Sequence, residues 1–131
     1  MRASGARPLD AASKVGLLVE AANRSASVGR MLRGWDRCVG LAIGPDRIHL
    51  LIDGGRASLG PPPAGDAGLS FELDESTLDR LMGGALTPLE AKMQGLIRTS
   101  GSLIDVLRFA AILSGSVKEA ARAGDAGRLL S

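Results

Sequence analysis

Aromatic side chains are almost absent from this sequence of 131 residues. It contains two phenylalanines, one tryptophan and no tyrosine, although apolar residues make up 45% of the chain. A chain of this length is expected to form one domain with a single core. We therefore expect residues 1–131 to form one domain filled by aliphatic side chains, with flexible ends over residues 1–7 and 115–131.

Cysteine and histidine each occur once, as Cys38 and His49. A single cysteine excludes an internal disulfide framework and fits a reducing compartment, so we expect a cytoplasmic protein. One cysteine and one histidine are too few for a metal site built from several such ligands, and they offer little basis for a Cys–His nucleophile pair. We predict no catalytic residue, no metal and no cofactor, and we interpret His49 as an ordinary strand position.

Long apolar runs and a strong charge of one sign are also missing. No run reaches the roughly 18 residues of a membrane-spanning helix, and no signal-peptide block follows the basic start. The net charge is only +2, and aromatic residues do not alternate with the basic ones, so we expect no nucleic-acid partner. We interpret Arg24, Arg30, Arg33 and Arg37 as a solvated face, with weak contact to an anionic membrane surface as the alternative.

Helix and strand patterns succeed one another along the chain. Apolar residues at helical spacing predict helices over residues 8–23 and 28–34, followed by Trp35, which we interpret as a core residue rather than a ligand-stacking one. The segment 60–68, rich in proline and glycine, predicts a loop. Alternating small or polar and apolar residues predict strands over residues 38–43, 48–52, 56–59 and 69–73.

Capping residues mark three further helices. Asp74 precedes a short helix, and Thr87, Pro88 and Glu90 form a capping box in front of the next one. Ser102 is the expected cap of the last helix, over residues 103–113.

That last helix is apolar nearly all round. Only Asp105 and Arg108 are polar between residues 103 and 113. Such a helix is buried on most sides, contacts a second chain or borders a cavity. We favour a cavity or an interface, because a domain this small has about one layer of neighbours to bury it.

The order of these pieces resembles the sterol carrier protein type-2 family. The resemblance covers residues 28–113 and rests on Trp35, the turn Asp53-Gly54-Gly55, the segments 69–74 and 84–95, and Gly101. It implies an α+β fold, with a five-stranded mixed, mostly antiparallel β-sheet covered by helices and enclosing an apolar tunnel. It also implies non-covalent binding of a sterol, a fatty acyl chain, acyl-CoA or another lipid, without a cofactor.

The resemblance gives the inward-facing apolar residues a role as the lining of this tunnel. The expected ligand-binding residues are Leu41, Ile43, Leu50, Ile52, Phe71, Leu73, Leu78, Leu81, Met82, Leu89, Met93, Ile97, Thr99, Ile104, Leu107 and Ala111.

Two features depart from the family pattern. Thr99 stands where the family has an inward apolar side chain, and its hydroxyl is expected to bond to backbone or to a polar atom of the guest. The loop over residues 60–68 is expected to reshape the tunnel mouth.

Three functional hypotheses follow. The first is a non-catalytic intracellular carrier of a small hydrophobic ligand, in which the C-terminal helix shifts to open the tunnel. The second is an enzyme or accessory protein of lipid, isoprenoid or polyketide metabolism, for example a cyclase, with Thr99, Asp105 or Arg108 near the substrate. The third is a protein-interaction module that uses the last helix. The oligomeric state stays open.

Overall fold

The computed structural model describes residues 10–62 and 68–123. The expectation of a flexible start over residues 1–7 falls outside these ranges. The elements, in chain order, are α1 (Ala11–Arg24), α2 (Ala26–Leu32), β1 (Arg37–Ile43), β2 (Asp46–Asp53), β3 (Arg56–Leu59), β4 (Gly68–Leu73), α3 (Glu75–Met82), α4 (Pro88–Met93), β5 (Arg98–Ser100) and α5 (Leu103–Arg122).

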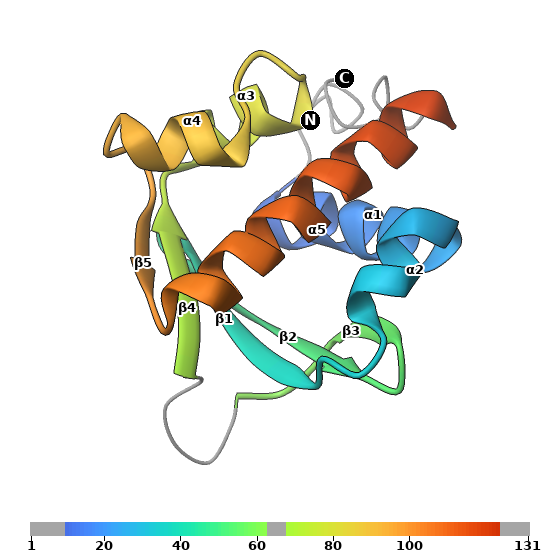
Figure 1. Ribbon diagram of the computed structural model, residues 1–131. Coiled ribbons are helices and arrows are strands. Elements are labelled where there is room, and N and C mark those ends of the chain that lie inside the picture. The colour runs from blue at the N-terminus through green and yellow to red at the C-terminus, as the bar shows by residue number, and fades with distance from the viewer. Residues whose placement is uncertain (1–9, 63–67, 124–131) are drawn as a thin grey trace, which may run out of the picture.

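The five strands form one mixed sheet in the order β3-β2-β1-β4-β5 (Figure 1). The neighbours β1 and β4 are parallel, and the other three pairs are antiparallel. This arrangement confirms the predicted α+β class with a five-stranded, mostly antiparallel sheet. The Gly54-Gly55 turn between β2 and β3 has positive φ at both glycines, which is the conformation that a tight two-residue hairpin requires.

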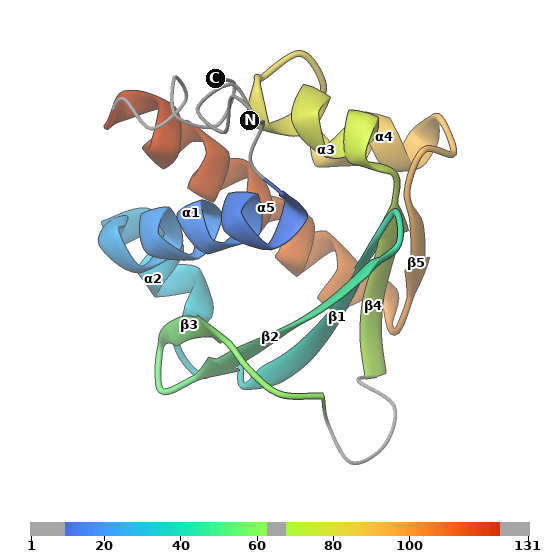
Figure 2. The same ribbon diagram turned by 180° about the vertical axis from the view of Figure 1, so that it is seen from behind.

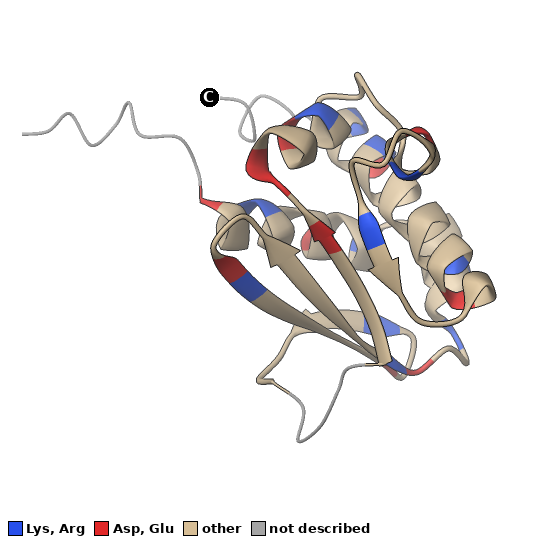
Figure 3. Ribbon diagram, turned by 90° about the vertical axis from the view of Figure 1, so that its left-hand side faces the viewer, with Lys and Arg blue, Asp and Glu red and all other residues tan. Residues whose placement is uncertain are grey.

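The two faces of the sheet differ in character. On β1, Val39, Leu41 and Ile43 are buried, whereas the small residues between them are half-buried on the opposite face. The helices lie beside the first face: α1 packs on β2 and β3, and α5 packs on α1 (Figures 1 and 2). None of the described helices lies on the other face (Figure 3). The alternation of one buried and one open face explains the period-two pattern of the sequence.

The caps expected from the sequence are present. Asp74 accepts from the Thr77 amide at 2.8 Å, and Ser102 accepts from the Asp105 amide at 3.2 Å. The capping box of α4 is complete in both directions between Thr87 and Glu90. These bonds satisfy amides that a helix start leaves without partners, which fixes where each helix begins.

The last helix is longer than the sequence indicated. Residues 115–122 were expected to be flexible, but α5 continues as a helix to Arg122. Gly115 explains the continuation, because a Cβ at this position would lie 2.7 Å from Cγ2 of Val28. The glycine therefore lets α5 approach α2 closely, and the contact stabilises a stretch that local propensity disfavours. Residues 124–131, the remainder of the expected flexible end, lie outside the described ranges.

Candidate functional site

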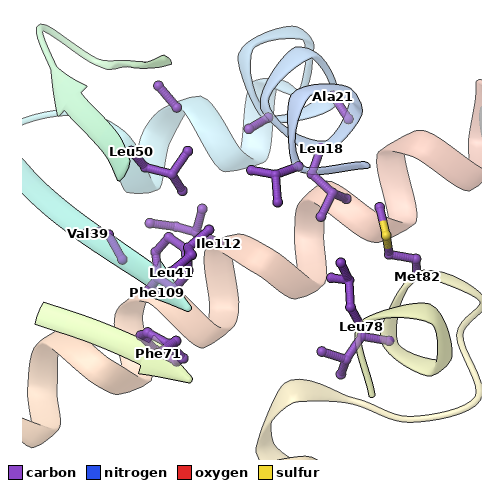
Figure 4. Close-up of a cluster of buried hydrophobic side chains, with 14 of the residues drawn as sticks. Leu18, Ala21, Val39, Leu41, Leu50, Phe71, Leu78, Met82, Phe109 and Ile112 are labelled. Carbon is purple, nitrogen blue, oxygen red and sulfur yellow. The ribbon is translucent and has the colours of Figure 1, made fainter. Parts of the chain in front are cut away.

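An apolar cavity lies between the buried face of the sheet and the helices α1, α3 and α5. Its volume is about 60 Å³. Figure 4 shows side chains of the sheet, α1, α3 and α5 converging in this region. The lining residues are Val15, Leu18, Val19, Ala22, Leu41, Ile43, Leu50, Ile52, Ala57, Phe71, Leu73, Leu78, Leu81, Ile97, Phe109, Ile112, Leu113 and Ser116.

Strand register builds the floor of the cavity. Leu41 on β1 is paired with Phe71 on the parallel strand β4, and Ile43 is paired with Leu73 two residues later. Because residues directly opposite each other point to the same face, these pairs form two adjacent rows under the helices.

The roof comes mainly from α1 and α5. Leu18 of α1 and Ile112 of α5 are buried above the floor (Figure 4). Phe109 of α5 meets Phe71 of the floor, with ring centroids 4.9 Å apart and planes tilted by 52°. This tilted pair is a favourable aromatic geometry, and it joins roof and floor on one side of the cavity.

Ser116 supplies the one hydroxyl of the lining. It donates to the carbonyl of Ile112 in the same helix at 2.7 Å, so its hydrogen is already used. The lining can therefore solvate a hydrocarbon but has no free donor to orient a polar group.

The size of the cavity limits what it holds without rearrangement. A volume of about 60 Å³ is well below the roughly 150 Å³ of an engineered apolar cavity that binds benzene. It is also below the roughly 300–1,000 Å³ of ordinary ligand pockets. A short hydrocarbon segment fits, and a longer chain requires lining side chains or a helix to move.

Nine of the sixteen residues predicted from the sequence line this cavity. They are Leu41, Ile43, Leu50, Ile52, Phe71, Leu73, Leu78, Leu81 and Ile97. Met82 is buried in the core nearby but does not contribute to the lining.

Five of the predicted residues lie on the outer surface instead. Leu89, Met93, Ile104, Leu107 and Ala111 are exposed, and the expectation that they face the interior is corrected. The reason is the composition of α5: a helix that is apolar all round gives no pattern that separates its inner stripe from its outer one. The helix α4 has only six residues, which is too short for its apolar residues to show which side is buried. The buried side carries Pro88 and Ala91.

Thr99 is half-buried, and its hydroxyl bonds to a side chain of α4. Its Oγ1 accepts from Nζ of Lys92 at 2.8 Å, whereas the predicted partner was a backbone group or a polar atom of the ligand. Thr99 is paired with Phe71 across β5 and β4, but it lies outside the cavity lining. The hydroxyl therefore helps to join α4 to the edge strand.

The cavity has further lining residues that the sequence pattern did not predict. The pattern indicates the apolar stripe on α1 but not the surface that this stripe covers. Phe109 and Ile112 belong to the apolar run of α5, for which the sequence predicted a different inward stripe. The added residues are Val15, Leu18, Val19, Ala22, Ala57, Phe109, Ile112, Leu113 and Ser116.

A polar cluster anchors the first turn of α5 beside the cavity. Nε1 of Trp35 donates to Oδ1 of Asp105 at 3.0 Å, and Arg37 forms an ion pair with the same carboxylate at 3.1 Å. Arg108 donates to the carbonyl of Met31 at 2.7 Å. The hydrogen bond from Arg37, followed by that from Trp35, holds the pKa of Asp105 below its ordinary value.

Trp35 is buried, as the sequence analysis expected of a core residue, and it lies outside the cavity lining. The guanidinium groups of Arg37 and Arg108 lie 5.3 and 5.6 Å from its ring centroid. Both distances are in the range of cation–π attraction. The indole is therefore fixed on several sides and serves to hold α5 against the corner after α2.

Two of the four arginines expected to form a solvated face have their charge neutralised by an ion pair. Arg24 forms an ion pair with the buried Glu119 of α5 at 3.3 Å, and Arg37 with Asp105. These pairs tie α1 and the start of β1 to α5, while Arg30 and Arg33 are exposed.

A further ion pair connects α1 to α3. Nζ of Lys14, which is almost fully buried, donates to Oδ1 of the half-exposed Asp79. Because an ammonium group in an apolar surrounding requires a charge partner, this pair fixes α3 against α1.

The residues with reactive side chains lie away from the cavity. His49 and Cys38 are half-buried on the open face of the sheet. Within residues 10–62 and 68–123, no group of three or more His, Cys, Asp or Glu side chains is placed to hold a metal ion. No helix in the same ranges is long and apolar enough to cross a membrane.

Comparison with protein families gives one match over more than half of the chain. The model of the SCP-2 sterol transfer family matches residues 18–114. This segment extends from the cavity-lining face of α1 to the middle of α5, so it includes nearly the whole site. No curated protein matches the chain.

Solved structures show the same fold at low sequence identity. A conserved hypothetical protein of Thermus thermophilus, described as a possible sterol carrier protein, has a TM-score of 0.63 and 22% identity, over 86% of this chain and 87% of that one. A protein described as UbiJ-SCP2 ubiquinone synthesis protein has a TM-score of 0.61 and 17% identity, over 84% and 95%. Palmitated SCP2L2 of Aedes aegypti has a TM-score of 0.61 and 14% identity, over 80% and 95%.

Proposed function

Because the chain belongs to the SCP-2 sterol transfer family, we propose that it binds an aliphatic chain non-covalently and transfers it without changing it chemically. The observation that carries this proposal is the composition of the cavity. Its lining is aliphatic and aromatic except for Ser116, whose hydroxyl is engaged within α5. Moving a hydrocarbon from water into such a lining is favourable by about 0.8 kcal/mol per methylene and needs no catalytic group.

The ligand class that fits best is a flexible chain, such as a fatty acyl or isoprenoid chain. A flexible chain enters a cavity of about 60 Å³ stepwise, as rotations of Leu and Ile side chains make room. A rigid sterol skeleton requires the whole space at once. The palmitated Aedes aegypti protein, which shares the fold, supports the choice of a fatty acyl chain. A cytoplasmic site of action is part of this proposal.

A displacement assay tests ligand binding directly. The purified protein is titrated with a fluorescent fatty acid, and unlabelled palmitate then competes for the site. We expect saturable binding with one probe per chain, and native mass spectrometry of protein purified from cells should show a bound lipid. A protein that is free of lipid after gentle purification and does not take up the probe would contradict the proposal.

Two serines of α5 supply matched variants for this assay. Ser116→Leu fills the cavity, because this side chain points into the lining. Ser114→Leu makes the same chemical change in a groove on the outer side of the helix. We expect Ser116→Leu to weaken probe binding about tenfold or more and Ser114→Leu to leave it nearly unchanged. Equal binding by the two variants would show that the probe binds elsewhere.

A second candidate is an accessory role in isoprenoid or quinone biosynthesis. The similarity to the ubiquinone synthesis protein favours it, because an isoprenoid tail is also an aliphatic chain. In this role the protein presents a substrate to an enzyme and does not perform the reaction. A cyclase is less well supported, since Thr99, Asp105 and Arg108 lie outside the cavity lining. Competition between a polyprenyl alcohol and palmitate for the fluorescent probe distinguishes the two ligand classes.

A further inference from the structure

Five exposed aliphatic side chains belong to α4 and α5, two helices that contact each other. Leu89 and Met93 of α4 are 51% and 79% exposed, and Leu103, Ile104 and Leu107 of α5 are 65%, 78% and 45% exposed. We call these five residues the outer patch. Only two other large apolar side chains in the described part of the chain are as open, Leu51 and Leu59. The concentration of exposed apolar residues on two neighbouring helices marks an interaction surface.

The two helices of the outer patch form a shallow apolar groove. It has a volume of about 210 Å³, and it is lined by Thr87, Pro88, Leu89, Leu107, Ala110, Ala111 and Ser114. The groove lies on the side of α5 opposite Phe109 and Ile112, which face the cavity. One helix therefore separates the outer patch from the candidate ligand site.

The charges around the outer patch have a small positive excess. The carboxylate of Asp105 is paired with Arg37, whereas that of Glu90 accepts from a neutral donor, the backbone amide of Thr87. Lys92 and Arg108 likewise bond to neutral oxygen atoms, those of Thr99 and Met31. Arg98 on β5, one residue before Thr99, has a side chain that is 84% exposed and forms a 3.9 Å ion pair with Glu72.

Three cations, Lys92, Arg98 and Arg108, thus stand against two carboxylates, Glu90 and Glu72, which leaves the rim of the outer patch with one excess positive charge. From the patch and its rim we propose that α4 and α5 dock on a lipid bilayer that contains anionic headgroups. The outer patch enters the interfacial region, and Lys92, Arg98 and Arg108 meet the headgroup phosphates. Both forces act together in surface-bound helices, because apolar burial and charge attraction to anionic lipids add.

A second copy of this chain is a weaker candidate for the same surface. Symmetric pairing would bring the same excess of positive charge onto both sides of one interface. The outer patch also consists of Leu, Ile and Met, without the tryptophan and tyrosine anchors that dominate specific protein interfaces. A bilayer needs no shape-specific anchor, so aliphatic side chains are sufficient.

Docking by this surface gives the proposed carrier a way to load and unload, and the inference rests on that proposed function. An aliphatic chain that leaves the cavity into water loses the stabilisation that favours its burial. With α5 at the bilayer, the chain passes from the cavity to the membrane when that one helix shifts. The basic residues Arg30 and Arg33 belong to α2 and its C-cap rather than to α4 or α5, and they are not needed for this contact.

Vesicle co-sedimentation tests the inference. We expect the protein to bind vesicles of phosphatidylcholine mixed with phosphatidylglycerol, and to bind pure phosphatidylcholine vesicles less. Met93→Gln and Ile104→Gln should each weaken the partition coefficient about tenfold, since a buried aliphatic side chain contributes one to two decades to such an equilibrium. Both side chains are highly exposed, so neither change disturbs the core.

Two control variants match these changes. Leu59→Gln alters a side chain that is 47% exposed on β3, the edge strand farthest from β5, and should leave binding unchanged. Arg98→Gln should weaken binding to anionic vesicles about fivefold, while Arg56→Gln on β3 should not. A patch variant that binds as tightly as the wild type, or a wild type that binds no vesicles, would overturn the inference.

Two further measurements distinguish bilayer docking from dimerisation through the outer patch and from the proposed ligand binding. If analytical ultracentrifugation shows a dimer that Ile104→Gln converts to a monomer, the outer patch is an interface between copies, and bilayer docking is rejected. The patch variants should still bind the fluorescent fatty acid as the wild type does. A wild type that binds the probe but no vesicles overturns docking alone, whereas a wild type that binds vesicles but no probe overturns the proposed function alone.

Discussion

At the residue scale, Gly115 has the clearest individual role. A Cβ at this position would lie 2.7 Å from Val28 Cγ2, which is closer than packed atoms approach. We predict that Gly115→Ala lowers the free energy of unfolding by about 1–3 kcal/mol, because α5 must move away from α2. Urea denaturation measures the change.

Gly16 of α1 supplies the control for that substitution. It is also helical, but a Cβ there has open space around it. Gly16→Ala should raise the free energy of unfolding by about 0.5–1 kcal/mol, since alanine loses less backbone entropy in a helix. If both substitutions stabilise the protein, a Cβ at position 115 has room between α2 and α5.

Asp105 makes the stability of the folded protein depend on pH in the acid range. Its pKa is lowered in the folded protein, first by the hydrogen bond from Arg37 and then by that from Trp35. A carboxyl group with a depressed folded pKa contributes stability above its unfolded pKa, and this contribution is lost as the pH falls through the folded value. We predict that the melting temperature of the wild type falls more steeply below about pH 4 than that of Asp105→Asn.

Asparagine at position 105 keeps an oxygen that can accept from Trp35, so the comparison isolates the charge. Asp53→Asn, which removes one carboxylate from an exposed position at the end of β2, controls for the general effect of charge on acid stability. The melting temperature of Asp53→Asn should fall with pH as steeply as that of the wild type. If the melting temperatures of the wild type and Asp105→Asn fall equally steeply in acid, the ion pair with Arg37 contributes nothing measurable to stability.

At the element scale, the sequence predicted the strands and caps well and the orientation of α5 poorly. Leu69, Ser70 and Phe71 could be assigned to faces because a strand has a strict period of two and one face of this sheet is open. Thr87 and Glu90 could be assigned because a capping box is a local chemical pattern. Elements whose signal is local or strictly periodic are therefore the predictable ones.

The inner stripe of α5 could not be obtained in the same way. Phe109 and Ile112 face the cavity, whereas Ile104 and Leu107 face outward, yet all four are large and apolar. The choice between these stripes is made by tertiary contacts, such as that of Arg108 with the carbonyl of Met31. The floor of the site could thus be predicted from the sequence, and its roof could not.

The two halves of α5 should differ in how readily they open. The first half has its outer face uncovered over Leu103, Ile104 and Leu107, while the second half packs on α1 and α2 through Ser116, Ala120 and their neighbours. Amide exchange follows local opening, which costs less where fewer apolar contacts are lost. We predict faster hydrogen exchange over residues 103–111 than over residues 112–120, measured by mass spectrometry.

Bound lipid should reduce this difference if the first half of α5 opens to admit it. A ligand under the helix adds contacts to Phe109, so exchange over residues 103–111 should slow on addition of palmitate. If α5 is protected uniformly and more strongly than every strand, with and without palmitate, the helix does not open to admit the lipid.

At the scale of the whole molecule, the small cavity has a consequence for ligand length. The void of about 60 Å³ accepts the first methylenes of a chain with little rearrangement. Each should improve the dissociation constant about fourfold, which corresponds to about 0.8 kcal/mol. Later methylenes must displace packed side chains, whose lost contacts offset part of that gain.

We therefore predict a curve with two slopes when affinity is plotted against the length of a saturated fatty acid. Calorimetric titration of a series from butanoate to hexadecanoate measures it, and the heat capacity change should be negative throughout, because apolar surface is buried at every length. Ser116→Leu should move the change of slope to a shorter chain, since it removes space that the first methylenes occupy. A single constant slope would mean that the cavity is already open to full length in solution, and affinity independent of length would mean that the chain does not enter it.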